Sequence, residues 1–195
     1  MLGNSSGLAA VVFWLSLAGW MAAETFIFVQ GRSVSAEGSD QDRGSVWPLL
    51  AAVYGSVALA LAVAIPLHAL RLPGAAVWFW LGIVVLWAGI GFRMWAVRTL
   101  GSFFQPVVTI QTEHRLVTSG PYRLVRHPSY TGALLTTLGV GLATANPVCV
   151  VLVVVIPVLG YLPRIAVEEQ ALAGALGAEY AEYQRVSARL VPGVW

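Results

Sequence analysis

The chain has 195 residues, of which 58% are hydrophobic and 10% are charged, with a formal net charge of +2 at pH 7. This composition excludes an ordinary soluble globular protein, in which about a quarter of the residues are charged. Long apolar blocks stand where a sheet-rich protein would show frequent turn signals. The sequence therefore predicts an all-α polytopic integral membrane protein, with about five transmembrane segments in a single domain, 1–195.

The N-terminal half contains three apolar blocks of spanning length. They cover about 8–29, 47–70 and 75–97. In the first block, Glu24 lies near the end, where its carboxylate is expected to reach the membrane interface. In the second, Pro66 is expected to kink the helix, because proline lacks a backbone donor and clashes with the preceding turn. In the third, Arg93 is expected inside the span or at its edge.

The C-terminal half, 98–195, begins with the longest polar segment, 98–128. Two apolar runs, 129–145 and 147–162, follow and are separated by the turn signal Asn146-Pro147. Each run is short for a full span of about twenty residues, so whether this hairpin crosses the bilayer stays open. The last segment, 164–186, is predicted to be one amphipathic helix. Its apolar face would carry Leu172, Leu176, Tyr180 and Tyr183.

The arginines are distributed unevenly between the two predicted sides. With five segments, nine of them share one side, and Arg71 stands alone on the other. The nine are Arg32, Arg43, Arg98, Arg115, Arg123, Arg126, Arg164, Arg185 and Arg189. The positive-inside rule then places the polar loops 30–46 and 98–128, with the C-terminal region, in the cytoplasm and the N-terminus outside. The polar segments 98–128 and 164–195 are thus expected to meet at one membrane face, where they can close over a cytosolic cofactor.

The polar stretch GPYRLVRHPSYTG, 120–132, is the first candidate site. Pro128 is suited to the first position of a helix, and the free N–H groups that follow it would attract a carboxylate or phosphate. Arg123 and Arg126 add positive charge. Gly120 and Gly132 permit a positive φ or a close backbone approach. Binding of lipid phosphate by the arginines, and a capping role for the histidine of this stretch, are the plainer alternatives.

The second candidate site follows the hairpin directly. Arg164 and Glu168 are four residues apart and share one helix face near the headgroup boundary. A charge in that position is costly unless it is paired or functional, so a structural ion pair is the plainer alternative. The single cysteine, Cys149, lies in an apolar run, and no Cys/His cluster has the spacing of a zinc site. No metal site is therefore predicted.

Two motifs together carry a family resemblance. HRLVTSGPYRLVRHPSYTG (114–132) and RIAVEEQAL…GAEYAEYQRVSARLVP (164–192), with an Asn-Pro-broken hairpin between them, resemble the isoprenylcysteine carboxyl methyltransferase family. That family is related to the membrane phospholipid methyltransferases. The resemblance covers about 98–195. The first three spans resemble the family only as hydrophobic helices.

The resemblance implies an integral membrane enzyme that uses S-adenosylmethionine. It assigns Arg164 to the methyl-accepting substrate. It assigns the segment 114–117 to the cofactor pocket through backbone groups, while the spacing from Gln111 to His114 differs from the family pattern. The implied cofactor contacts are Gln111, His114, Arg115, Leu116, Val117, Tyr122, His127, Pro128, Ser129, Tyr130 and Glu168.

The acceptor is expected to be lipophilic, either a small molecule or a lipidated substrate, and to come from the bilayer; membrane lipids are the other expected partners, and nucleic acid is not. A carboxylate acceptor is favoured, because it is already a nucleophile and no further base stands near the motifs. All eleven basic residues are Arg, which fits a bacterial source and hence the inner membrane. A sequence of this kind does not identify the acceptor itself.

Two other functions remain compatible with the residues. Membrane sterol and steroid reductases that use NADPH carry a similar Arg-His-x-x-Tyr-x-Gly turn. The glutamate pair and the Glu-Tyr-x-x-Tyr run fit the methyltransferase pattern better. A non-catalytic membrane protein whose basic turn binds anionic lipid is the third possibility.

Overall fold

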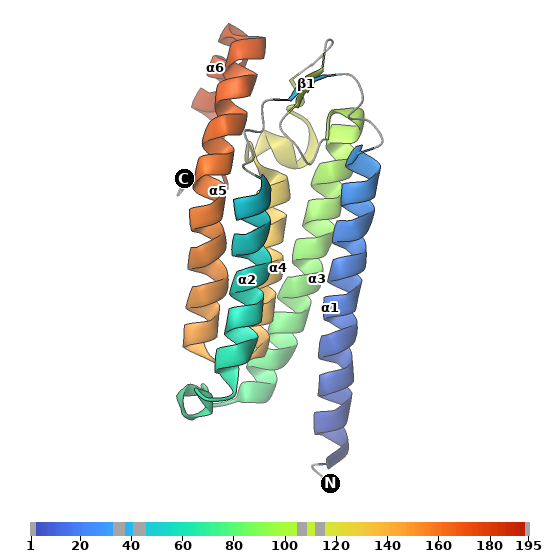
Figure 1. Cartoon of the computed structure of the whole chain (residues 1–195), viewed down its shortest axis with the longest axis vertical. Coiled ribbons are helices and arrows are strands. Elements are labelled where there is room, and N and C mark those ends of the chain that lie inside the picture. Colours follow the sequence, from blue (N-terminus) through green and yellow to red (C-terminus); the bar gives the residue numbers. More distant parts are fainter. Residues whose placement is uncertain (1–2, 33–37, 41–45, 105–108, 112–115, 194–195) are drawn as a thin grey trace.

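The computed structural model describes residues 3–32, 38–40, 46–104, 109–111 and 116–193, and its long helices form an antiparallel bundle (Figure 1). The α-helices are α1 (Gly3–Arg32), α2 (Val46–Ala64), α3 (Ala75–Leu100), α4 (Pro128–Ala143), α5 (Pro147–Leu176) and α6 (Ala178–Val186). Three single turns of 3-10 helix are η1 (His68–Leu70), η2 (Gly101–Phe103) and η3 (Gly120–Arg123). A three-residue pairing joins β1 (Gly38–Asp40) to β2 (Thr109–Gln111). The all-α prediction is confirmed.

Four of the described helices, α1, α2, α3 and α5, are long and apolar enough to cross a membrane. The fifth segment of the bundle, α4, has 16 residues. At 1.5 Å per residue it is about 24 Å long, shorter than a hydrocarbon core of about 30 Å. It turns into α5 at Asn146, whose side chain accepts from the Val148 N–H and donates to the Leu67 carbonyl. The predicted Asn-Pro turn is therefore present.

Two predicted helix boundaries were wrong. The second span ends at Ala64 instead of continuing through a kink to residue 70. Pro66 lacks a donor and disfavours helical geometry at the residue before it, so the chain leaves the helix and forms η1. The segment 164–186 is not one helix, because α5 runs on through Pro163 to Leu176. Gly177, with φ +55°, then starts the separate helix α6.

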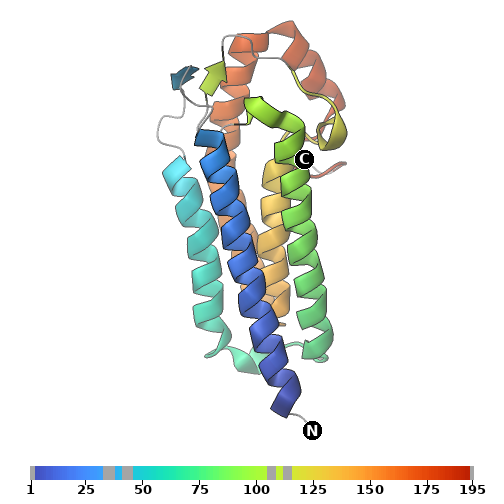
Figure 2. The ribbon, with the colours of Figure 1, turned by 90° about the vertical axis from the view of Figure 1, so that its right-hand side faces the viewer.

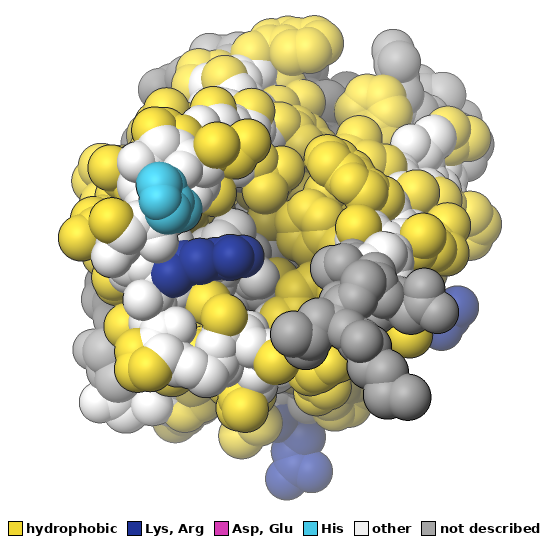
Figure 3. Space-filling model, turned by 90° about the horizontal axis from the view of Figure 1, so that it is seen from below, with side chains coloured by type: hydrophobic (Ala, Val, Ile, Leu, Met, Phe, Trp, Pro, Cys, Tyr) yellow, Lys and Arg dark blue, Asp and Glu magenta, His cyan; other side chains and the backbone are white. Residues whose placement is uncertain are grey.

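The two ends of the bundle differ in character. The strands, α6 and η3 gather at one end, and the N-terminus lies at the other (Figures 1 and 2). Hydrophobic side chains predominate on the end that holds the α2–α3 connection (Figure 3). There Arg71 is tied down, since its Nε donates to the Thr144 carbonyl at 3.3 Å. The described parts of the loop 30–46, of the polar segment 98–128 and of the C-terminal region thus share one end, as predicted.

Helices α3 and α4 approach each other through glycines. A Cβ added at Gly89 would lie 2.4 Å from the Thr136 nitrogen, and one at Gly132 would lie 2.7 Å from the Arg93 nitrogen. Neither position tolerates a side chain, because such distances are far below van der Waals contact. The close approach holds the start of α4 against α3. The close backbone approach expected at Gly132 is confirmed. Gly120 has a positive φ, as expected, with a value of 56°.

Candidate functional site

A cavity of about 370 Å³ lies among the helices at the polar end of the bundle. This size suits a small-molecule or cofactor site. The side toward α1 and α2 is mainly apolar and includes Met21, Ile27, Phe28, Leu49 and Leu50. The opposite side carries most of the polar groups and comes from the segment before α4, the start of α4, α5 and α6. The same cavity thus has a polar wall on one side and an apolar wall on the other.

On the polar wall, the side chains of Arg164 and Glu168 both bond to the hydroxyl of Tyr130. The hydroxyl donates to Glu168 Oε2 at 2.7 Å and accepts from Arg164 Nε at 3.2 Å. Arg164 is 3% exposed, so α5 holds its guanidinium well inside the protein. Glu168 is more open, with 31% of its side chain exposed. Arg164 and Glu168, which were predicted to share a helix face, are therefore linked through the uncharged hydroxyl of Tyr130.

The neighbouring glutamate, Glu169, has a different position. Its carboxylate accepts from Arg126 Nε at 3.0 Å and pairs with Arg189 at 3.0 Å. It also lies 3.4 Å from His127 Nε2. Glu169 is buried and is not among the residues that line the cavity. Its contacts fix the wall behind the cavity, while Glu168, one residue earlier, faces into it.

Backbone hydrogen bonds hold the C-terminal segment against this wall. Val125 and Ala188 form a parallel bridge, and the Arg126 N–H donates to the Ala188 carbonyl at 2.7 Å. The Tyr183 hydroxyl donates to the Tyr122 carbonyl at 2.6 Å. Burial raises the pKa of Tyr183 to about 12, so its phenol remains a donor at neutral pH. These contacts hold α6 over the cavity.

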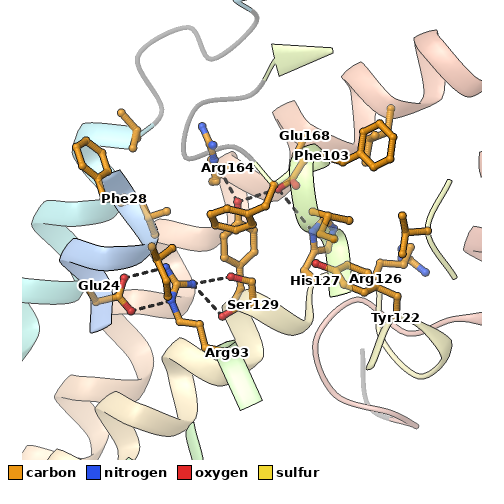
Figure 4. Close-up of a pocket in the computed structure, with 18 of the residues that line it drawn as sticks. Glu24, Phe28, Arg93, Phe103, Tyr122, Arg126, His127, Ser129, Arg164 and Glu168 are labelled. Atoms are coloured by element: carbon orange, nitrogen blue, oxygen red, sulfur yellow. Dashed lines mark hydrogen bonds and ion pairs between the residues drawn. The ribbon is translucent and has the colours of Figure 1, made fainter. Parts of the chain in front are cut away.

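A second charged group stands between the polar and apolar walls. Glu24 of α1 pairs with Arg93 of α3, with 2.7 Å between Oε1 and Nε (Figure 4). The same guanidinium donates to the Ser129 hydroxyl at 2.7 Å and to the Ser129 carbonyl at 3.0 Å. Glu24 was expected to reach the membrane interface; in the structure its carboxylate has an internal partner in Arg93. An apolar environment favours an internal partner over an isolated charge.

Most of the predicted site residues come together in the described structure. Eight of them line the cavity: Leu116, Val117, Tyr122, His127, Ser129, Tyr130, Arg164 and Glu168. Pro128 is buried and begins α4, as expected, but is not part of the lining. Gln111 is the last residue of β2, and its side chain lies outside the described part. His114 and Arg115 also lie outside the described residues.

The predicted anion site at the start of α4 needs a correction. The N–H groups of Tyr130 and Thr131 both bond to the His127 carbonyl, at 3.0 and 3.1 Å. They are therefore not available to a ligand in the way the sequence suggested. Arg123 is exposed and does not line the cavity, whereas Arg126 lines it and is bonded to Glu169. The positive charge of this stretch mainly stabilises the wall.

Sequence reasoning missed the Glu24–Arg93 pair and the contribution of α1 and α2. A signal was present, since α1 carries the acidic Glu24 and α3 the basic Arg93 in an otherwise apolar stretch, each about two turns before its helix ends. Both helices run in the same direction, which places the two charges at similar depth (Figure 1). The tyrosines of α6, read as packing residues, also line the cavity.

Comparison with known proteins agrees with this arrangement. A model of the isoprenylcysteine carboxyl methyltransferase (ICMT) family matches residues 80–174, which include most of the polar wall. Residues 80–174, just under half of the chain, therefore match this family. It is 36% identical over 127 residues to protein-S-isoprenylcysteine O-methyltransferase A of Arabidopsis thaliana, covering 63% of this chain and 64% of the relative. The enzyme of Tribolium castaneum is 33% identical over 118 residues, covering 58% of this chain and 42% of the relative.

The fold is similar to that of a solved family member. The structure of the eukaryotic intramembrane Ras methyltransferase ICMT matches with a TM-score of 0.56 and 22% identity, over 100% of this chain and 88% of that one. The protein is thus an integral membrane protein with an ICMT-like fold. The chain spans 64% or less of the length of the plant and insect relatives cited above.

Proposed function

We propose that this protein is a membrane methyltransferase that uses S-adenosylmethionine to methylate a carboxylate on a lipophilic, isoprenylcysteine-like acceptor. The observation that carries the proposal is the meeting of Arg164 and Glu168 at the Tyr130 hydroxyl, inside a cavity whose other wall is apolar. A polar cofactor and a lipophilic acceptor would meet in such a site.

The polar wall has the chemistry that the cofactor requires. Glu168 offers an open carboxylate to an ammonium or to ribose hydroxyls. Tyr122, Leu116 and Val117 give a partly apolar surface suited to an adenine ring. His127 is 4% exposed and stacks on Tyr130 with 5.6 Å between ring centroids, so its place in the wall is fixed. In this proposal the C-terminal half, 98–195, holds the cofactor.

The apolar wall suits the acceptor. Phe28 of α1 and Leu49 and Leu50 of α2 line the cavity and can contact an alkyl or prenyl chain. The helix α1 packs mainly on α3, and the outward faces of α1 and α2 carry exposed apolar side chains such as Leu15 and Trp47. A lipophilic acceptor would therefore come from the bilayer. The three N-terminal helices supply this part of the site.

Catalysis would rest mainly on positioning. S-adenosylmethionine supplies a methyl group on a cationic sulfonium, which a carboxylate can attack without a general base. Arg164 would hold the acceptor carboxylate by charge-assisted hydrogen bonds and orient it for in-line attack. The buried setting of Arg164 excludes water, which strengthens that contact. The neighbouring Glu24–Arg93 pair adds no net charge to the site.

The proposal also places the protein in the bacterial inner membrane with this site facing the cytoplasm. The polar end of the bundle carries η3, α6 and the described arginines Arg123, Arg126, Arg185 and Arg189. The positive-inside rule puts such an end in the cytoplasm. That orientation would give the cofactor direct access to the cavity.

The experiment uses purified, detergent-solubilised protein. Calorimetric titration with S-adenosylhomocysteine should give saturable binding that is lost or weakened in Glu168→Ala. Incubation with radiolabelled S-adenosylmethionine and an S-farnesylated N-acetylcysteine should then give a product that releases methanol in base, as a methyl ester does. Binding of NADPH alone would favour a reductase, and binding of neither ligand would favour lipid binding without catalysis.

A further inference from the structure

The phenol of Tyr180, on α6, is an unused hydrogen-bond donor at the cavity. Tyr180 lines the cavity and is 1% exposed. Among the described residues its hydroxyl has no hydrogen-bond partner, and it is out of contact with solvent. Buried donors are normally satisfied, so this one calls for a physical account.

The position of Tyr180 is fixed by its neighbours. Tyr183 lies three residues later on the same face of α6, and its hydroxyl is already bonded to the Tyr122 carbonyl. The two rings are 6.1 Å apart. The anchored Tyr183 therefore keeps the preceding turn of α6, and Tyr180 with it, against the cavity. The unpaired hydroxyl of Tyr180 therefore belongs to a side chain that its neighbours hold in place.

The surroundings of Tyr180 show what kind of group it would meet. Burial, followed by the nearby carboxylates of Glu169 and Glu168, raises the pKa of its phenol, so the group remains a donor at neutral pH. Glu169 is engaged by Arg126 and Arg189. Of these two carboxylates, Glu168 is the one that lines the cavity. Tyr180, a donor, and Glu168, an acceptor, both line this cavity.

We propose that Tyr180 and Glu168 together bind a ribose hydroxyl of the cofactor, with Glu168 accepting the hydroxyl hydrogen and Tyr180 donating to the hydroxyl oxygen. This inference rests on the proposed use of S-adenosylmethionine. A hydroxyl both donates and accepts, which matches this pair of groups. An ammonium group only donates, so it would leave Tyr180 unsatisfied. The nucleoside half of the cofactor is therefore the part that α6 contacts.

The test compares two ligands on full-length protein with Tyr180→Phe. S-adenosylhomocysteine carries the nucleoside and the amino-acid tail, and methylthioadenosine carries the nucleoside alone. Loss of one neutral hydrogen bond should weaken binding of both ligands by the same factor, about threefold to tenfold. Wild-type affinity of the variant for both ligands would overturn the inference. Weakening for S-adenosylhomocysteine alone would overturn the assignment to the ribose.

Thermal unfolding without ligand separates ligand binding from a structural role. Removal of an unsatisfied hydroxyl should leave the unfolding temperature of Tyr180→Phe unchanged or raise it. Tyr183→Phe is the matched control, since it removes a bonded hydroxyl from the same helix and should lower the unfolding temperature. If Tyr180→Phe lowered it as much as the control does, the hydroxyl would be structural. Failure of the wild-type protein to bind either ligand would instead contradict the proposed function itself.

Discussion

Glu24 of α1 and Arg93 of α3 form a two-point ion pair at the wall of the cavity, with 2.7 Å between Oε1 and Nε and 2.9 Å between Oε2 and Nη2. Each side chain is 15% exposed. The same guanidinium reaches Ser129 at the start of α4. One pair thus links α1, which packs mainly on α3, to the segment that carries the candidate site.

Breaking this pair should destabilise the bundle. Glu24→Gln leaves Arg93 in an apolar setting without a counter-charge, and removal of one partner of a buried pair costs about 3 kcal/mol. Thermal unfolding in detergent should show a lower midpoint for Glu24→Gln and for Arg93→Gln. The double variant should be less destabilised than the sum of the two single changes, because the partners interact directly. Additive effects would mean that the pair contributes little.

The two adjacent glutamates should respond differently to the same substitution. Glu169→Gln removes the charge that Arg126 and Arg189 share, so it should lower the free energy of unfolding by about 3 kcal/mol. Glu168→Gln alters a carboxylate at an open cavity wall, so stability should change by less than about 1 kcal/mol. The affinity of the Glu168→Gln variant for S-adenosylhomocysteine should fall about tenfold or more, as expected for the loss of one hydrogen bond to a charged group.

Calorimetry and thermal unfolding of the two variants, measured side by side, check this division. The substitution is chemically identical at both positions, so each variant is the control for the other. Equal loss of stability in both would mean that Glu168 also belongs to the structural wall. Unchanged cofactor affinity in Glu168→Gln would remove it from the proposed site.

Much of the site was predictable because it lies in short local motifs. The segment from Tyr122 to Tyr130 and the Arg164–Glu168 pair are each nearly contiguous, and helix periodicity puts the pair on one face. The turn at Asn146-Pro147 follows from local turn chemistry. The same local logic failed at Pro66 and Gly177. Whether a proline kinks or ends a helix, and where a glycine takes positive φ, depends on packing beyond the motif.

The remainder depended on tertiary contacts. The partner of Glu24 lies 69 residues away on α3, so no local pattern shows it. The N–H groups after Pro128 were expected to be free, but the His127 carbonyl accepts two of them. The ion pair of Arg126 with Glu169 and the backbone bridge of Val125 with Ala188 likewise join segments that are far apart in the sequence. Sequence patterns identify the polar groups, and the bundle decides which of them pair with each other.

The close approach of α3 and α4 predicts a contrast between two glycines on one helix. An alanine at Gly89 would place its Cβ 2.4 Å from the Thr136 nitrogen, whereas nothing lies within 4 Å of a Cβ at Gly91. Gly89→Ala should therefore separate the helices and cost about 1–3 kcal/mol of stability. Gly91→Ala should be neutral or stabilising by about 0.5–1 kcal/mol, because alanine favours helix. Thermal unfolding of both variants measures the difference, and similar midpoints would argue against tight packing here.

The orientation in the membrane is testable without knowledge of the substrate. A fluorescent protein fused after Trp195 should fluoresce in a bacterial host, because the polar end of the bundle is expected in the cytoplasm. An epitope inserted after Gly74, in the turn at the other end, should be accessible to antibody from the outside of intact spheroplasts. A non-fluorescent fusion after Trp195 together with an epitope after Gly74 that is inaccessible from outside would show the reverse topology. Cofactor access from the cytoplasm would then be excluded.

Arg164 should affect turnover more than cofactor binding. It is 3% exposed and bonds to the Tyr130 hydroxyl, so replacement by alanine leaves a cavity that can itself disturb folding. Arg164→Lys is the more informative variant, because it keeps the positive charge and loses the planar fork that binds a carboxylate at two points. With a prenylated cysteine acceptor, kcat should fall about 10- to 100-fold, the loss expected for one or two charge-assisted hydrogen bonds. Affinity for S-adenosylhomocysteine should stay close to that of the wild type. The opposite result, lost cofactor binding with the KM for the acceptor unchanged, would move Arg164 from the acceptor to the cofactor.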